Sequence, residues 1–140
     1  MIESQRPSSR PPRPASPLET AKLCAAAALD RKALDVVLLD VAGLSGFADY
    51  FLLASGRSTR QATAVAEQIK RTLKKAGVRP LGAEGLRQGA WVLLDYGDVV
   101  VHVFHQPVRE FYDLEALWGD APRVSLPPGE LAGLLPNPEP

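Results

Sequence analysis

Residues 50–77 read YFLLASGRSTRQATAVAEQIKRTLKKAG, and within them a strand pattern passes directly into a helix pattern. Tyr50 to Ser55 is an apolar run of strand length. Ser58 is a typical N-cap, with Gln61 at the reciprocal position of a capping box. The apolar positions that follow recur at helical spacing, and they are Ala62, Val65, Ala66, Ile69, Leu73 and Ala76. Gly77 is suited to end this helix, because glycine readily adopts the left-handed conformation.

The flanking segments extend this pattern into a complete order of elements. Upstream, Ser16 and Pro17 predict the start of a helix that runs to about residue 32, and residues 35–41 predict a buried strand. Downstream, residues 90–95 and 99–105 predict two strands joined by a hairpin turn, and residues 80–86 a short edge strand. Pro107 predicts a short helix to about Trp118. The order α-β-β-α-β-β(-β)-α predicts an α/β sandwich with a mixed β-sheet.

The two ends of the chain differ in composition from its middle. Residues 1–15 contain mainly Pro, Arg and Ser with almost nothing apolar to bury, and residues 124–140 contain five prolines. Such segments are typical of flexible tails. The length of 140 residues leaves room for one hydrophobic core. We therefore expect a single domain over residues 16–123, between an N-terminal tail (1–15) and a Pro-rich C-terminal tail (124–140).

The overall charge balance argues against a nucleic-acid binding protein of the strongly basic kind. Sixteen Lys and Arg residues match sixteen Asp and Glu residues, so no net positive field draws the chain onto a polyanion. We therefore expect little direct RNA contact. The single cysteine, Cys24, excludes an internal disulfide and favours a reducing compartment. No apolar run reaches the length of about 18 residues that spans a bilayer, so a membrane partner is not expected. Residues 1–14 resemble an organelle transit peptide in composition, but their four prolines would break its amphipathic helix, so the cytoplasm is the expected location.

The acidic and histidine residues near the hairpin do not form a convincing catalytic or metal site. Asp95 and Asp98 lie three residues apart on either side of a turn, where aspartate is common for conformational reasons. His102 and His105 have an odd spacing on one strand, so their side chains point to opposite faces and cannot share a metal ion. We therefore predict no catalytic residues, no metal and no cofactor.

The loop from Ser55 to Arg60 could bind an anion, because a helix start offers free amide hydrogens and two arginines lie nearby. It lacks the spacing of a dinucleotide-binding or P-loop motif, and Ser58 is already explained as a helix cap. The alternative left open is a nucleotidyltransferase-like nucleotide- or phosphate-binding enzyme that would use this loop with Asp95 and Asp98.

The segment 107–118 is rich in bulky side chains. We expect these to hold the short helix onto the sheet, and they are Val108, Phe111, Tyr112, Leu114, Leu117 and Trp118. Arg109 and Asp113 have the i, i+4 spacing of a solvated ion pair, with Glu110 nearby. This part of the chain is therefore predicted to be mainly structural.

Several ordered blocks together resemble the ribosomal silencing factors, also called the RsfS or Iojap family. Residues 82–85 read GAEG, residues 91–104 read WVLLDYGDVVVHVF and residues 109–119 read REFYDLEALWG. The spaced residues Asp40, Gly43 and Ser45, the Ala48-Asp49-Tyr50 triplet, and Ser55, Gly56, Ser58 and Arg60 fit the same pattern. The likeness extends from about residue 18 to residue 123.

The resemblance implies a non-enzymatic factor that binds the large ribosomal subunit through its fourteenth protein. Bound there, it would block association with the small subunit and repress translation, with a possible role in large-subunit assembly. The implied fold is similar to that of nucleotidyltransferases, without their catalytic carboxylates, since the segment 80–86 offers only Glu84.

We therefore expect a docking surface at a sheet edge that binds a basic ribosomal protein, with tryptophan at its centre. Its predicted residues are Trp91, Leu81, Gly82, Glu84, Asp95, Asp98 and His102. An exposed edge strand also leaves a homodimer open, because such edges pair readily.

Overall fold

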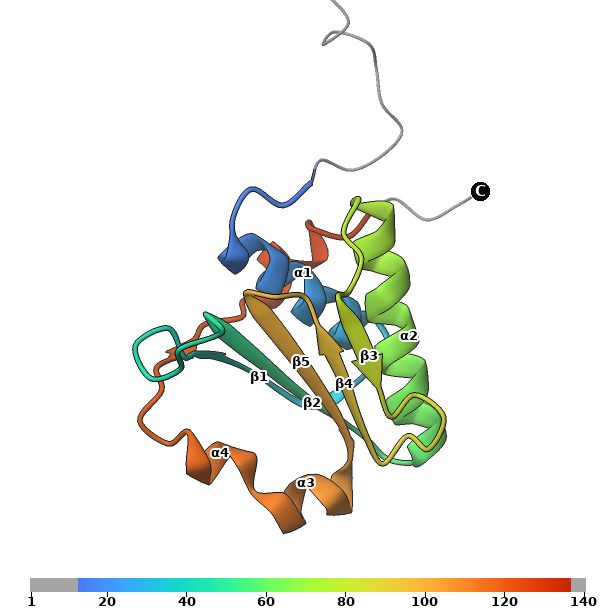
Figure 1. Ribbon diagram of the computed structural model, residues 1–140. Helices are drawn as coiled ribbons and strands as arrows, with labels where there is room; N and C mark the ends of the chain where they lie inside the picture. Colours follow the sequence, from blue (N-terminus) through green and yellow to red (C-terminus); the bar gives the residue numbers. More distant parts are fainter. Residues whose placement is uncertain (1–12, 137–140) are drawn as a thin grey trace, which may run out of the picture.

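The computed structural model describes residues 13–136 and contains one mixed sheet between two helical layers (Figure 1). The strands are β1 (Leu34–Asp40), β2 (Tyr50–Gly56), β3 (Gly82–Glu84), β4 (Trp91–Asp95), β5 (Val99–His105) and β6 (Arg123–Val124). Their order across the sheet is β3-β4-β5-β2-β1-β6. The pair β2 and β5 is parallel and the other pairs are antiparallel. The predicted α/β fold with a mixed sheet is thus confirmed.

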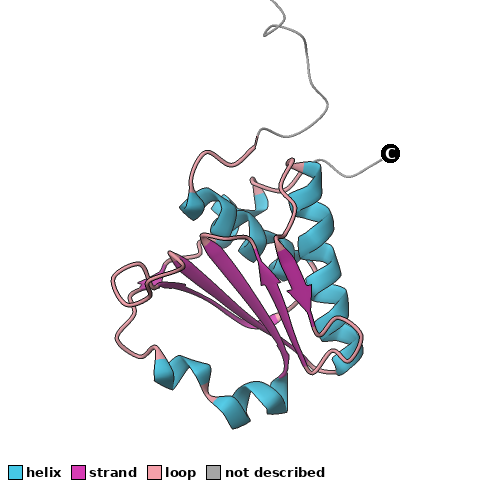
Figure 2. Cartoon of the chain, viewed as in Figure 1, coloured by secondary structure: helices cyan, strands magenta, loops and turns pink. Residues whose placement is uncertain are grey.

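Five helices surround this sheet in the described part of the chain. They are α1 (Pro17–Asp30), α2 (Thr59–Lys75), α3 (Gln106–Tyr112), α4 (Leu114–Leu117) and α5 (Pro128–Ala132). The helices α1 and α2 lie on one face of the sheet, whereas α3 and α4 lie on the other (Figures 1 and 2). None of the helices over residues 13–136 combines the length and apolarity needed to cross a bilayer.

Both predicted helix caps form. Ser16 Oγ accepts a hydrogen bond from the Glu19 amide at 3.2 Å, and Ser58 Oγ accepts one from the Gln61 amide at 3.0 Å. A second hydrogen bond closes each cap from the other direction. The Glu19 carboxylate accepts from the amide of Ala15, and the Gln61 side-chain oxygen accepts from the amide of Arg57, each one residue before the N-cap. These bonds satisfy amides that a helix start otherwise leaves without partners.

The larger core lies between the sheet and the pair α1–α2. Apolar side chains of β2, β4 and β5 face α2 there, including Leu52, Val92, Leu94 and Val101, all fully buried. The helix α1 is buried on every side over residues 23–28, which read LCAAAA. A helix that is apolar all round must be covered by more than one neighbour. Besides the sheet and α2, α1 also contacts α5.

The segment from residue 124 to 136 corrects the prediction of a flexible C-terminal tail. Val124 pairs with Leu38 at the edge of the sheet, and Leu131 of α5 is buried in the larger core. Lys22 of α1 forms an ion pair with Glu130 at 2.9 Å. The prolines suggested a tail, but the apolar outer side of α1 needs a cover that this segment supplies. Residues 1–12 of the predicted N-terminal tail (1–15), and residues 137–140, lie outside the described residues.

Leu131→Ala should lower the free energy of unfolding by about 2 kcal/mol, because it removes a buried side chain and leaves a cavity against α1. Leu134→Ala is the matched control, since Leu134 is exposed and its loss should cost less than about 0.5 kcal/mol. Urea unfolding followed by circular dichroism measures both. Equal stability of the two variants would show that α5 adds nothing to the core.

Candidate docking surface

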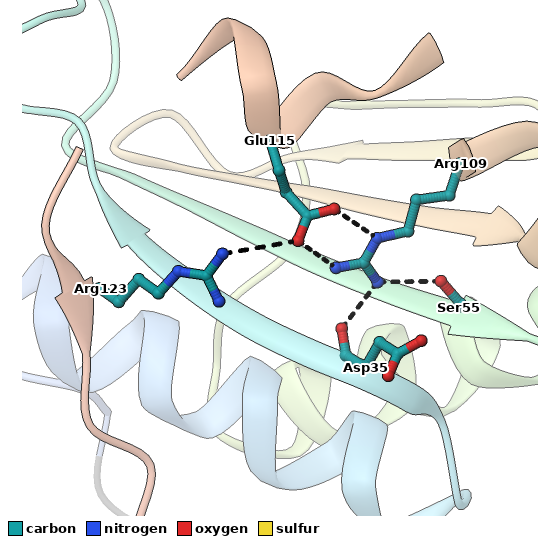
Figure 3. Close-up of polar contacts among 5 residues, drawn as sticks. All are labelled: Asp35, Ser55, Arg109, Glu115 and Arg123. Carbon is teal, nitrogen blue, oxygen red and sulfur yellow. Dashed lines mark hydrogen bonds and ion pairs between the residues drawn. The ribbon is translucent and has the colours of Figure 1, made fainter. Parts of the chain in front are cut away.

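The short helices on the open face of the sheet are tied to it by Arg109, which is only 6% exposed. Its guanidinium donates to both carboxylate oxygens of Glu115, each at 3.0 Å (Figure 3). It also donates to Ser55 Oγ at 2.9 Å and to the Asp35 carbonyl at 2.7 Å. Arg123 lies at the outer side of Glu115, at 3.9 Å. The predicted solvated pair of Arg109 with Asp113 is therefore wrong.

Asp113 divides the predicted single helix into α3 and α4. It has a left-handed backbone with φ of 47°, which ends α3 and reorients the chain before α4. Val108, Leu114 and Trp118 pack on the second apolar cluster of the sheet, as predicted. Phe111 is 80% exposed and Leu117 is 74% exposed, and Tyr112 is also exposed. For Phe111 and Leu117 the prediction of packing onto the sheet is wrong, whereas Tyr112, although 56% exposed, contacts the ring of Trp91 on β4.

The strand register brings together most of the predicted docking residues. Leu93 is paired with Glu84 on one side and with His102 on the other, and Asp95 is paired with Gly82 and Val100. Paired residues share a face, and side chains alternate along a strand. Trp91, Leu93 and Asp95 therefore line one face together with Glu84. It is the face opposite α1 and α2, on the side where α3 lies.

Trp91 is half-buried at the start of β4, and its ring is held on three sides. Its ring centroid lies 5.0 Å from that of Phe104 and 5.0 Å from that of Tyr112. Its indole Nε1 donates to His102 Nδ1 at 3.1 Å.

Gly85 has a φ of 81°, and a Cβ there would lie 2.1 Å from the Trp91 carbonyl oxygen. The GAEG turn thus needs glycine in order to fold back against the backbone of Trp91.

His102 supports Trp91 from below and is not itself a surface residue. It is 6% exposed, between Trp91 and the ring of Phe51. Burial lowers the pKa of His102 to about 4, so the ring is neutral near pH 7. Because Nδ1 accepts a hydrogen bond from the indole N–H, the hydrogen of the neutral ring is on Nε2, which has no partner among the described residues. The prediction that His102 is a partner-contacting residue is corrected, since its side chain is beneath the surface.

The other predicted residues form the margin of this surface. Leu81 is 78% exposed beside the hairpin turn, and Gly82 and Glu84 are exposed on the edge strand β3. Asp95 accepts from the Gly97 amide at 2.8 Å, which fixes the turn, and Asp98 is exposed. We call the surface formed by Leu81, Gly82, Glu84, Trp91, Asp95, Asp98, Phe111 and Tyr112 the docking face. Phe111 and Tyr112 were missed as surface residues because the prediction rested on their bulk, which does not by itself require burial.

The docking face has an apolar centre and an acidic margin. Large apolar side chains exposed together are uncommon on proteins that act alone and mark sites of interaction. Trp91 and the two aromatic residues of α3 are side by side, Glu84 and Asp95 lie on the same face of the sheet as Trp91, and Asp98 is exposed in the hairpin turn. This arrangement fits a partner surface that combines apolar and basic groups.

The loop from Ser55 to Arg60 does not offer an open anion site. The Ser55 hydroxyl accepts from Arg109, and the side chains of Ser58 and Gln61 take up nearby amides. A Cβ on Gly56 would lie 2.6 Å from the Ala62 nitrogen, so the strand end is already close against α2. Within residues 13–136 no three potential ligands among His, Cys, Asp and Glu gather as a metal site.

Comparisons with known proteins identify the relatives of this chain. The family model described as "Ribosomal silencing factor during starvation" matches residues 14–137. A ribosomal silencing factor RsfS of Bacillus subtilis is 48% identical over 105 residues, covering 75% of this chain and 89% of the relative. A chloroplast Iojap protein of Arabidopsis thaliana is 34% identical over 100 residues, covering 71% of this chain and 42% of that protein. A crystal structure of a Chromobacterium violaceum protein superimposes with a TM-score of 0.73 at 42% identity, over 79% of this chain and 92% of that one.

Arg109→Met should lower the free energy of unfolding by about 2 kcal/mol. Removing one partner of a fully buried ion pair costs roughly 3–5 kcal/mol, and the partial exposure of Glu115 reduces this. Arg123→Met is the matched control, and its weak, exposed contact should be worth less than about 0.5 kcal/mol. Urea unfolding of both variants would measure the difference. If the two lost equal stability, the buried network would not be what holds α3 and α4.

Acidification should destabilise the wild-type chain through His102. The folded pKa lies near 4, below the ordinary value of 6.5, so the unfolded chain binds a proton first. The contribution of neutral His102 is complete above pH 6.5 and is lost as the pH falls towards 4. Urea midpoints measured across this range should fall less steeply for His102→Gln than for the wild type. An unchanged fall in His102→Gln would contradict the assignment.

Proposed function

Because the chain belongs to the RsfS family of ribosomal silencing factors, we propose that it binds the large ribosomal subunit and prevents its association with the small subunit. Translation is then repressed while the factor is bound. The observation that carries the proposal, beside family membership, is the open face of the sheet with Trp91 at its centre. The proposed site of action is the cytoplasm, where the ribosomal subunits meet.

The proposed contact on the large subunit is its fourteenth ribosomal protein, bound through the docking face. Two features support this assignment. The half-buried Trp91 and the exposed Phe111 and Tyr112 form an aromatic group that a partner can desolvate, and aromatic anchors carry much of the energy of interfaces. The carboxylates of Glu84, Asp95 and Asp98 around it favour a basic partner surface, as expected of a protein that itself binds ribosomal RNA.

The proposed mechanism is steric and includes no chemical step. A protein that covers a standard interface of about 1,600 Å² in total excludes any other macromolecule from that area. The rigid attachment of α3 and α4 through Arg109 is important here, because a mobile segment would yield to a competing subunit. The same binding would be compatible with a role during late assembly of the large subunit.

A homodimer is a secondary proposal for the free protein. The strand β3 is exposed at the sheet edge, and its outer backbone groups are available for pairing with a second copy. Because Gly82 and Glu84 also belong to the docking face, such a dimer would compete with ribosome binding. Analytical ultracentrifugation of the pure protein measures this directly.

Trp91→Ala should weaken binding to purified large subunits by about 30-fold, which corresponds to about 2 kcal/mol for loss of an interface anchor. Sucrose-gradient sedimentation measures it. The wild-type protein should travel with large subunits and keep added small subunits from joining, whereas the variant should stay at the top of the gradient. Unimpaired joining of subunits in excess wild-type protein would refute the proposed function.

A surface variant separates a lost contact from lost folding. Glu84→Lys reverses an exposed charge on β3 and should slow association with large subunits, most strongly at low salt. Glu130→Lys reverses a charge on α5, away from the docking face, and should bind as the wild type does. Identical binding by both variants would mean that the acidic margin does not face the partner.

A further inference from the structure

The neutral net charge of the chain hides a separation of charge between its two sides. Residues 57–87 contain eight Lys and Arg but two Asp and Glu, whereas residues 88–122 contain one Arg and six Asp and Glu. The first segment includes α2, and the second includes α3 and α4 on the opposite face of the sheet (Figure 1). The segment that includes α2 is therefore basic, and the segment that includes α3 and α4 is acidic. The docking face uses the acidic side only.

The basic side is centred on the outer surface of α2. Arg60, Arg71 and Lys74 are exposed, and their spacing in the helix directs all three away from the sheet. The apolar stripe of α2 is buried against the sheet and α1. The helix has 17 residues and is therefore about 25 Å long, so these cations form a row and not a single point of charge.

The loops at both ends of α2 continue this row. Arg79 follows the helix, while Arg57 and Arg87 are exposed near its start. The loop that carries Arg87 is held on α2, because Thr63 Oγ1 donates to the Leu86 carbonyl at 2.9 Å. Two acidic residues lie beside the row: Glu67 of α2 pairs with Lys70, and Asp30 of α1 accepts a hydrogen bond from Gln68 of α2 at 3.2 Å.

We propose that the outer surface of α2, with Arg57, Arg79 and Arg87, contacts the phosphate backbone of an RNA. Most of its cations are arginines, whose planar forks match phosphate oxygens better than a lysine ammonium does. A membrane surface fits less well, because a helix that lies on a bilayer has exposed apolar side chains beside its cations. In the described part of the chain, α2 has no large exposed apolar side chain.

This inference goes beyond the proposed docking of the acidic side on a basic protein, and it replaces the expectation of little direct RNA contact. That expectation followed from the net charge, but a local row of cations acts on a phosphate chain within a Debye length of about 8–10 Å. If the proposed function holds, ribosomal RNA next to the bound factor is the natural ligand. The two charged sides would then orient the factor between a basic protein and RNA.

Binding of a fluorescent oligouridylate to the full-length chain, followed by anisotropy, tests the inference without ribosomes. Binding should weaken from about 50 to about 200 mM salt, as phosphate contacts require. Arg71→Gln/Lys74→Gln should bind at least about tenfold more weakly at low salt, with a salt slope lower by about 1.4, that is about 0.7 per lost contact on a single strand. Lys22→Gln/Arg123→Gln removes the same charge elsewhere and should bind as the wild type does.

Three outcomes would overturn the inference. They are absence of oligouridylate binding by the wild type, equal binding by the two double variants, and tighter binding of the α2 row to phosphatidylserine vesicles than to RNA. The proposed function is tested separately, because Trp91→Ala should bind oligouridylate normally while losing large subunits. If the wild-type protein bound large subunits through Trp91 but did not bind oligouridylate, the proposed RNA contact would be overturned and the proposed function would stand.

Discussion

The contacts of the buried Arg109 guanidinium are the interaction on which the proposed docking face depends. The guanidinium binds Glu115 of α4 on one side. On the other side it binds Ser55 at the end of β2 and the backbone carbonyl of Asp35 in β1. Without such a link, two short helices of seven and four residues would have little stability of their own, since isolated short helices are marginal in water. The position of Tyr112 against Trp91 follows from this link, and so does the shape of the docking face.

The two faces of the sheet differ in how completely they are covered. The α1–α2 face is closed by complementary apolar packing, which α5 completes by covering the outer side of α1. The other face keeps its aromatic residues only partly covered. Trp91 is fixed by His102, Phe104 and Tyr112, so its ring is already in place before a partner arrives. An anchor held in this way loses little conformational entropy on binding, which favours affinity.

The two faces of the sheet also differ in the sign of the charges that lie on them. The acidic margin of the docking face and the basic row of α2 lie on opposite sides of one rigid sheet, although the chain as a whole is neutral. A neutral protein with separated charges is oriented by a charged surface without being held strongly by it. On a surface built of both RNA and basic proteins, such a molecule can meet each with the complementary side.

The sequence by itself determined the element types, the helix caps, the hairpin and the mixed α/β architecture, because these depend on local periodicity and on side chains three or four residues apart. The grouping of Trp91 with Glu84 and Asp95 followed from the resemblance to the ribosomal silencing factors, and the strand register puts these three residues on one face. Only the tertiary structure decided the burial of Arg109 and His102, the exposure of Phe111 and Tyr112, and the packing of residues 124–136. Arg109 meets partners 54 and 74 residues away in the chain, and no local pattern records such a contact. A side chain's surroundings depend on which distant segments fold against it, and for this reason burial and charge separation became visible only in three dimensions.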